Sequence, residues 1–255
     1  MSHGLRSSPR PFLRPQWPAP ATVQALVTGR TGGISLPPYD SLNLGDHVGD
    51  APAAVAANRQ SLQTQAGLPA APLWLSQVHG TRCVNAAQAQ PGDEADAVVA
   101  KAPGLVCAIM TADCLPLLLC DRAGTCVGAA HAGWRGLLDG VIESTLAALG
   151  CPPGEVLAWL GPAIGPRAFE VGPEVRAAFI TEDPTAATAF TPKDGPTEKW
   201  LCDIYALARL RLARAGVTAV YGGEHCTYTE REDFFSYRRD GTTGRMASLI
   251  WLQPR

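Results

Sequence analysis

The chain has 255 residues, of which 46% are hydrophobic and 17% are charged, proportions that suit a globular protein with a sizeable core. Its formal net charge is −2, so the charge balance gives no reason to expect a nucleic acid or an anionic membrane as a partner. No apolar run approaches the ~20 residues of a membrane-spanning helix. The composition therefore favours a protein that binds neither nucleic acid nor membrane.

Residues 1–22 are predicted to form a disordered tail ahead of a single domain over residues 23–255. The first twenty residues hold three arginines and five prolines, and no acidic residue precedes Asp40. This segment lacks the apolar stretch of a signal peptide, and its prolines would break the amphipathic helix of a transit peptide.

The eight cysteines are predicted to be free thiols. Cys107, Cys120 and Cys126 lie in apolar runs, where cysteine behaves as a small core residue. The sequence contains no CxxC pair, so it offers neither a zinc ribbon nor a thioredoxin-like motif. Without an export signal, we expect the protein in the reducing environment of the cytoplasm.

Predicted strands and helices alternate along the chain. Short apolar runs predict strands at residues 23–28, 73–78, 105–110, 115–120, 125–130, 156–160, 217–221 and 246–252. Helical spacing and end signals predict three helices: from a cap at Asp50 to Ala66, from Leu137 to Leu149, and from a cap at Asp203 to Ala215. This alternation predicts an α/β (α+β) sandwich, in which mixed β-sheets are flanked by helices.

Three residues with metal-binding side chains follow predicted strands, namely His79, Cys114 and His131. Strand ends are rigid and neighbouring strands lie about 4.8 Å apart, so residues distant in sequence can converge there. Two imidazoles and a thiolate suit zinc, and three protein ligands leave one coordination position open, as in catalytic zinc sites. Zinc in such a site brings the pKa of a bound water near 7. We therefore predict a catalytic zinc centre.

The same residues allow two other interpretations. Cys114 could be a nucleophile activated by His79 or His131, as in a thiol hydrolase, and the spacing does not separate this case from a metal site. A structural zinc site in a non-enzymatic protein is the weakest interpretation, because such sites usually have four protein ligands.

Two polar residues near the predicted first helix could line a substrate cleft. Arg59 falls on the apolar stripe of that helix, where a guanidinium needs a carboxylate, such as Asp46 or Asp113, or an anionic ligand. Asn43 stands in a polar loop and could line the same cleft or simply belong to a turn.

The segment at residues 235–241 places two more arginines beside aromatic residues. Arg238 and Arg239 could hold a substrate anion, and a solvated turn is the equally simple alternative. Asp113, next to Cys114, could transfer protons or support a metal ligand, or it could be a turn residue.

The motifs around these residues resemble those of the YfiH-type family, whose members are labelled polyphenol oxidases or laccase-domain proteins and purine nucleoside phosphorylases. The matching stretches run in the family's order from about residue 23 to the end, and all three metal positions match. They are QVHG at 77–80, ADA at 95–97, TADCLP at 111–116, AHAGWRG at 130–136, GPAIG at 161–165, FEV at 169–171, CTY at 226–228, FSYRRDG at 235–241 and GR at 244–245.

The resemblance implies zinc held by His79, Cys114 and His131 in a compact α/β sandwich similar to cysteine-hydrolase folds. It implies phosphorolysis of purine nucleosides (adenosine, inosine, guanosine and methylthioadenosine) with phosphate as the second substrate, and adenosine deamination in addition. Other members resemble editing enzymes that hydrolyse an amide bond in peptidoglycan precursors carrying the wrong amino acid.

The family's oxidase label can be tested on the sequence. A copper-dependent polyphenol oxidase of the multicopper type binds several coppers, mostly through imidazoles, and the five histidines are too few for that cluster. The donor atoms of the single predicted centre would also suit copper in place of zinc. The zinc cytidine-deaminase signature, HxE with PCxxC, is also missing, so deamination would need a different arrangement.

Overall fold

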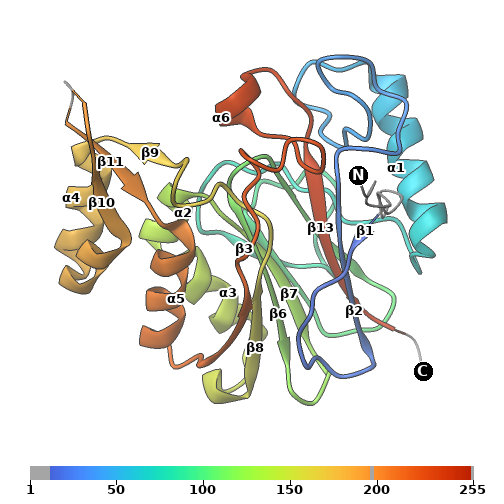
Figure 1. The fold of residues 1–255 in the computed structure, drawn as a ribbon. Helices are drawn as coiled ribbons and strands as arrows, with labels where there is room; N and C mark the ends of the chain where they lie inside the picture. Colours follow the sequence, from blue (N-terminus) through green and yellow to red (C-terminus); the bar gives the residue numbers. More distant parts are fainter. Residues whose placement is uncertain (1–11, 196–197, 254–255) are drawn as a thin grey trace, which may run out of the picture.

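The computed structural model describes residues 12–195 and 198–253, which form a layered α/β sandwich. Two large sheets pack face to face, helix α1 covers one outer face, and most of the other helices cover the opposite face (Figure 1). The predicted fold class is confirmed. No helix among the described residues has the length and apolar character needed to cross a bilayer.

The first sheet is antiparallel and has the strand order β1-β2-β13-β5. Its strands are β1 (Phe12–Leu13), β2 (Val23–Thr28), β5 (Val106–Thr111) and β13 (Met246–Leu252). Successive side chains of a strand point to opposite faces. Ile250 of β13 accordingly packs between the two sheets, whereas Leu249 and Trp251 pack against the layer of α1.

The second sheet is mixed and has the order β12-β8-β6-β7-β4-β3. Its strands are β3 (Cys83–Asn85), β4 (Ala97–Ala100), β6 (Leu115–Asp121), β7 (Val127–Ala132), β8 (Val156–Leu160) and β12 (Ala219–Gly222). In β6, Leu118 and Cys120 face the first sheet, while Leu117 and Leu119 face the helices. Both faces are therefore buried, which explains the unbroken apolar run of this strand.

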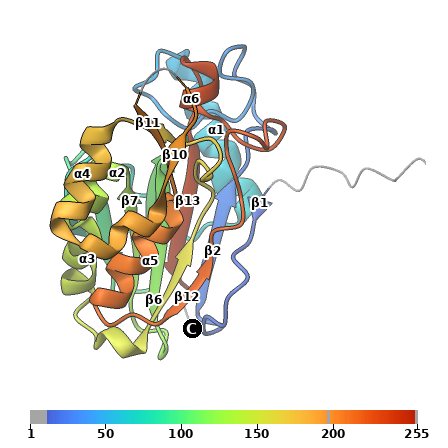
Figure 2. The ribbon, with the colours of Figure 1, turned by 60° about the vertical axis from the view of Figure 1, so that its left-hand side comes forward.

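Helices close both sides of the sandwich, as Figure 2 shows from another direction. Leu62 of α1 (Pro52–Ala66) packs on the first sheet, and α2 (Trp134–Asp139), α3 (Val141–Leu149) and α5 (Ile204–Arg214) cover the second. Beside α5 lies a small antiparallel sheet of order β10-β11-β9, with α4 (Pro173–Glu182) against it. Its strands are β9 (Glu170–Val171), β10 (Phe190–Lys193) and β11 (Lys199–Cys202), and a short α6 (Tyr237–Asp240) precedes β13.

The predicted tail is wrong for its second half. Residues 1–11 lie outside the described part of the chain, but Phe12 and Leu13 form β1 and pair with Thr28 and Val27 of β2. Leu13 also packs against the core between the sheets, as does Trp17. Apolar side chains spaced between the prolines thus tie this segment to the sandwich.

Three local predictions also need correction. Residues 73–78 form only isolated bridges, because Leu73 pairs with Cys107 and Ser76 with Glu94, two different segments, and the amide of Val78 binds a carboxylate. The predicted helix from 137 to 149 is interrupted by Gly140, whose φ of 105° lies in the left-handed region and separates α2 from α3. Asp50 does not cap α1, whose N-cap is Ala51 without a side-chain bond.

Candidate metal centre

His79, Cys114 and His131 converge at one end of the six-stranded sheet. Cys114 lies in the turn between β5 and β6, and His131 lies in β7 opposite Pro116 of β6. His79 belongs to the loop that precedes β3 on the edge of this sheet. One ligand atom from each of the three side chains lies within 4.8 Å of the other two, and His79 Nε2 is 3.8 Å from Cys114 Sγ.

A buried carboxylate organises two of these side chains. Asp96, which is fully buried, accepts hydrogen bonds from the backbone amides of Val78, His79 and Gly80 at 3.1, 2.9 and 2.7 Å. These bonds hold the turn in which His79 has a positive φ of 62°. The same carboxylate lies 2.7 Å from Nδ1 of His131, which leaves Nε2 of that ring for the centre.

The surroundings of Cys114 and His131 shift the protonation of both side chains. Burial disfavours the Cys114 thiolate, but His131 and His79 outweigh burial and lower the pKa of this thiol to about 6. Burial also disfavours the His131 imidazolium, yet Cys114 and Asp96 raise its pKa to about 9. The residues therefore favour a thiolate beside a cation, and a metal ion can take the place of the imidazolium proton.

The geometry suits one tetrahedral metal ion. Bond lengths of about 2.0–2.1 Å to nitrogen and about 2.3 Å to sulfur place the ligands of such an ion roughly 3.3–3.6 Å apart. The separation of 3.8 Å between His79 and Cys114 is close to this value. Gly133 keeps the space free, since a Cβ there would lie 3.0 Å from His79 Cδ2 and 3.1 Å from Cys114 Sγ. The donor atoms and the space around them therefore fit zinc or copper.

The three residues stand beside a cavity of about 240 Å³. Its walls combine apolar side chains with two arginines, and the side chains of His79 and Cys114 face it. The other lining residues are Ala112, Asp113, Trp134, Arg135, Ile164, Phe169, Ile204, Tyr237 and Arg238. A cavity with these walls suits a small ligand that has an aromatic part and an anionic part.

Arg59 and Asn43 lie away from this cavity. The Arg59 guanidinium pairs with Asp46 at 3.3 Å and packs 4.4 Å over the ring of Trp74, beside a separate cavity of about 570 Å³. Of the partners expected for Arg59, a carboxylate or an anionic ligand, the structure contains the carboxylate of Asp46. The side chain of Asn43 is fully buried and bonds to Gly45 and Asp50, so Asn43 supports a turn.

Of the two arginines predicted at 238 and 239, one reaches the cavity. Arg239 donates to the carbonyls of residues 227, 228 and 234 and to the carboxylate of Asp240, which engages its whole guanidinium. Arg238 lines the cavity, packs 5.6 Å over Phe169 and donates through Nη1 to the carbonyl of Glu170.

Asp113 holds neighbouring segments together beside Cys114. One of its carboxylate oxygens accepts from Thr227 Oγ1 and the other from the backbone amide of Arg238, both at 2.6 Å. These bonds join the turn between β5 and β6 to the segments before and within α6. Each oxygen thus has one protein donor, and Asp113 connects these segments at the rim of the cavity.

Sequence reasoning missed two residues that shape the centre. Asp96 was noted only within the stretch ADA, and Gly133 only within AHAGWRG. An acidic residue inside a run of small apolar residues, directly before a buried strand, is a signal that could have identified Asp96, because buried carboxylates need partners. Nothing in the sequence alone indicates which atoms a Gly133 side chain would meet.

Comparisons with known proteins identify the family of this chain. A family model described as multi-copper polyphenol oxidoreductase laccase matches residues 24–253. Purine nucleoside phosphorylase YfiH of Escherichia coli K12 is 57% identical over 242 residues, which cover 94% of this chain and 98% of that protein. A purine nucleoside phosphorylase of Pseudomonas aeruginosa is 56% identical over 244 residues, covering 95% and 98%.

Solved structures of relatives have the same fold. The crystal structure of a Neisseria meningitidis protein, 58% identical, superposes with a TM-score of 0.92 and covers 96% of this chain and 100% of that one. YlmD from Geobacillus stearothermophilus, 30% identical, gives a TM-score of 0.90 with 98% of both chains covered. The chain therefore belongs to the YfiH-type family, the family described as multi-copper polyphenol oxidoreductase laccase.

Proposed function

We propose that this protein is a metal-dependent purine nucleoside phosphorylase. The observation that carries the proposal is the position of the two histidines and the cysteine, beside a small cavity that has both apolar and cationic walls. The names of the relatives support the same activity. A purine ring needs apolar or aromatic contacts, and phosphate needs cations, so the walls of this cavity offer contacts for both substrates.

The residues of the chain divide these tasks. Ile164, Phe169 and Tyr237 provide apolar surface for the purine. Arg238, held by Glu170, presents positive charge to phosphate. Placing the phosphate oxygen next to C1′ of the ribose lets the new C–O bond form while the bond from C1′ to the base breaks. The base leaves with the bonding electron pair and takes up a proton from the phosphate OH or from water.

We propose zinc as the metal, held by His79, Cys114 and His131. Bound there, zinc would polarise an oxygen of phosphate or of water. Asp96 would fix the His131 ring in the tautomer that leaves Nε2 free for the metal. Copper fits the same donor atoms, so the identity of the metal requires elemental analysis of the purified protein.

The proposed substrates are adenosine, inosine, guanosine and methylthioadenosine, and we propose adenosine deamination as a further activity of this centre. The test is chromatography of zinc-analysed protein incubated with adenosine or inosine, with and without phosphate. Phosphate-dependent release of adenine and hypoxanthine is the expected result, with inosine formed from adenosine if the protein also deaminates. Absence of any purine product from protein with one zinc per chain would refute the proposal.

Matched variants sharpen this test. His79→Ala and Cys114→Ala should lose metal and turnover together, because each removes one of three ligands. His47→Ala is the control, since His47 is exposed and pairs with Asp46 away from the centre. Full turnover by a metal-free His79→Ala protein would contradict a role for the metal.

A second candidate function is amide hydrolysis with Cys114 as the nucleophile, which would suit editing of peptidoglycan precursors. The observation that favours it is the arrangement of Cys114, His131 and Asp96. The pKa of the Cys114 thiol is lowered, and the imidazole of His131 beside it is oriented by the carboxylate of Asp96. This candidate predicts a covalent adduct on Cys114, found by mass spectrometry, and activity that survives a chelator.

The family's description as a multicopper oxidase finds less support in this chain. Among the described residues, only His79 and His131 converge, while His47 and His225 pair with carboxylates elsewhere. A cluster of several coppers needs many more imidazole ligands than these two. The histidines therefore favour a centre with a single metal ion.

A further inference from the structure

The arginines near the candidate centre differ in how much of their hydrogen-bonding capacity is already used. Arg239 is engaged by three carbonyls and Asp240, and Arg59 pairs with Asp46 beside another cavity. Arg238 lines the 240 Å³ cavity and gives one guanidinium nitrogen to the carbonyl of Glu170. Arg135 also lines this cavity, at the first turn of α2.

The guanidinium of Arg135 has no ion-pair or hydrogen-bond partner within residues 12–195 and 198–253. Its Cζ lies 4.4 Å from the ring centre of Trp134, which lines the same cavity. Contact with an aromatic face limits the positions that the guanidinium can adopt, while its N–H groups point outward in the plane of the group. Such an arginine is prepared for a planar, bidentate contact with an oxyanion.

Among the described residues, Arg135 forms no ion pair with the acidic residue that lines the cavity. Asp113 is the acidic residue among those that line it, and both of its oxygens already accept short hydrogen bonds. The lining therefore carries two arginines, Arg135 and Arg238, against the single carboxylate of Asp113, and this excess of positive charge favours an anion. Two arginines from different elements, α2 and α6, can approach one anion from two directions.

We propose that Arg135 is a substrate-binding residue that holds the oxyanion, inorganic phosphate, in this cavity. The proposal rests on the proposed phosphorylase function and assigns its phosphate contact to a residue beyond Arg238. Trp134 orients the guanidinium, and the N–H groups of Arg135 donate to two phosphate oxygens.

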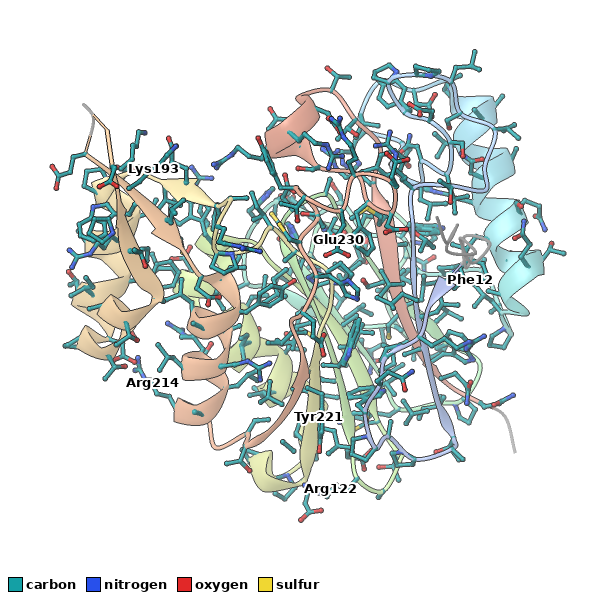
Figure 3. The ribbon with its side chains drawn as sticks, in the orientation of Figure 1. Phe12, Arg122, Lys193, Arg214, Tyr221 and Glu230 are labelled. Carbon is teal, nitrogen blue, oxygen red and sulfur yellow. The ribbon has the colours of Figure 1, made fainter. Side chains whose placement is uncertain are left out.

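The test compares Arg135→Gln, Arg135→Lys and the control Arg122→Gln. Arg122 is an exposed arginine that follows β6, at the end of this strand opposite Cys114, and it is labelled in Figure 3. Arg135→Gln should raise the KM for phosphate about tenfold or more, as expected for a lost charged hydrogen bond, and leave the KM for inosine within about twofold. Arg135→Lys should recover part of the loss, because lysine keeps the charge without the bidentate contact.

Calorimetric titration with inorganic phosphate separates this inference from the activity itself. Zinc-loaded wild-type protein and Arg122→Gln should bind phosphate, and Arg135→Gln should bind it about tenfold more weakly, with circular dichroism confirming that each variant is folded. This result would support Arg135 even if the wild-type protein released no purine base. Equal phosphate affinity in wild-type and Arg135→Gln protein, or no phosphate binding by the wild type, would overturn the assignment.

Discussion

Asp96 is the residue on which the local geometry of the candidate centre depends most. Its carboxylate accepts four hydrogen bonds, one of them from the ring of His131 and three from the loop that carries His79. Asp96→Asn replaces one carboxylate oxygen with an NH2 group, which is a donor and would face the donors that are now bound to that oxygen. We expect zinc affinity to fall by about 10–100-fold, measured by competition with a chromophoric chelator, together with a lower melting temperature.

A second buried carboxylate provides the control for Asp96→Asn. Asp121 accepts hydrogen bonds from Thr125 and Cys126 in the turn between β6 and β7, at the far end of β6 from Cys114. Asp121→Asn should also lower the melting temperature but leave zinc affinity unchanged. If both variants lost zinc equally, the effect of Asp96 would be general destabilisation and not orientation of the ligands.

A substitution at Gly133 tests whether metal binding needs the space between the ligands. Its φ of −60° is open to any residue, so a methyl group there acts only through its contacts with His79 and Cys114. Gly133→Ala should bind zinc at least about tenfold more weakly, with the far-ultraviolet circular dichroism of the wild type. Gly154→Ala is the matched control, because a Cβ at Gly154 meets no atom within 4 Å. Zinc bound equally well by both variants would show that the centre tolerates a bulkier wall.

At the scale of elements, the segment after β12 is fastened by a charged pair. Nδ1 of His225 lies 2.8 Å from Glu230, whose other oxygen accepts from the amide of Cys226; Glu230 is labelled in Figure 3. The bond to Glu230 raises the pKa of His225. Burial raises the pKa of Glu230, but the hydrogen bonds from His225 and from the amide of Cys226, together with the charge of His225, outweigh burial, and the net shift is downward.

The directions of these shifts set the pH window in which the pair stabilises the fold. The contribution of His225 is complete below its unfolded pKa of about 6.5 and is lost as pH rises through its higher folded value. That of Glu230 is complete above its unfolded pKa of about 4.3 and is lost as pH falls through its lower folded value. His225→Gln should therefore lower the free energy of unfolding more at pH 5.5 than at pH 8.5, measured by urea denaturation with a chelator in both buffers. An equal loss at both pH values would contradict a charged pair.

The sequence predicted the elements well where a single pattern determines them. The strands at 23–28, 156–160 and 246–252 have the predicted bounds, because short and mainly apolar runs between turn residues have few other ways to be buried. The segment at 73–78 begins with a similar apolar run, but its two bridges go to different segments, at Cys107 and Glu94, and no local pattern indicates that change of partner. The break at Gly140 was missed because apolar spacing continues across it from α2 to α3.

At the scale of the whole molecule, the candidate centre was partly predictable. His79, Cys114 and His131 could be chosen because each follows or ends an apolar run, and the structure brings them within 4.8 Å. The arginines could not be sorted in this way. Arg59 and Arg239 were as attractive as Arg238 in the sequence, and only the tertiary contacts show that carbonyls and carboxylates already occupy them.

The position of the centre also links the two large sheets. Cys114 follows β5 of the four-stranded sheet and precedes β6 of the six-stranded sheet, while His131 lies in β7. A metal ion held by these residues would connect the turn between β5 and β6 to strand β7 of the second sheet and to the loop of His79. Since the unfolded chain does not hold the three ligands together, such an ion binds the folded state preferentially and stabilises it.

Removal of the metal should therefore lower the melting temperature of the protein. Free zinc at 100 times its dissociation constant stabilises a fold by about 2.7 kcal/mol, which corresponds to roughly 5–10 °C for a chain of this size. Calorimetry of wild-type protein with zinc and after chelation should show this shift, and Cys114→Ser should show little of it because a hydroxyl is a poor zinc ligand. A shift of equal size in Cys114→Ser would mean that zinc stabilises the protein at another place, and the role assigned to the three residues would then be wrong.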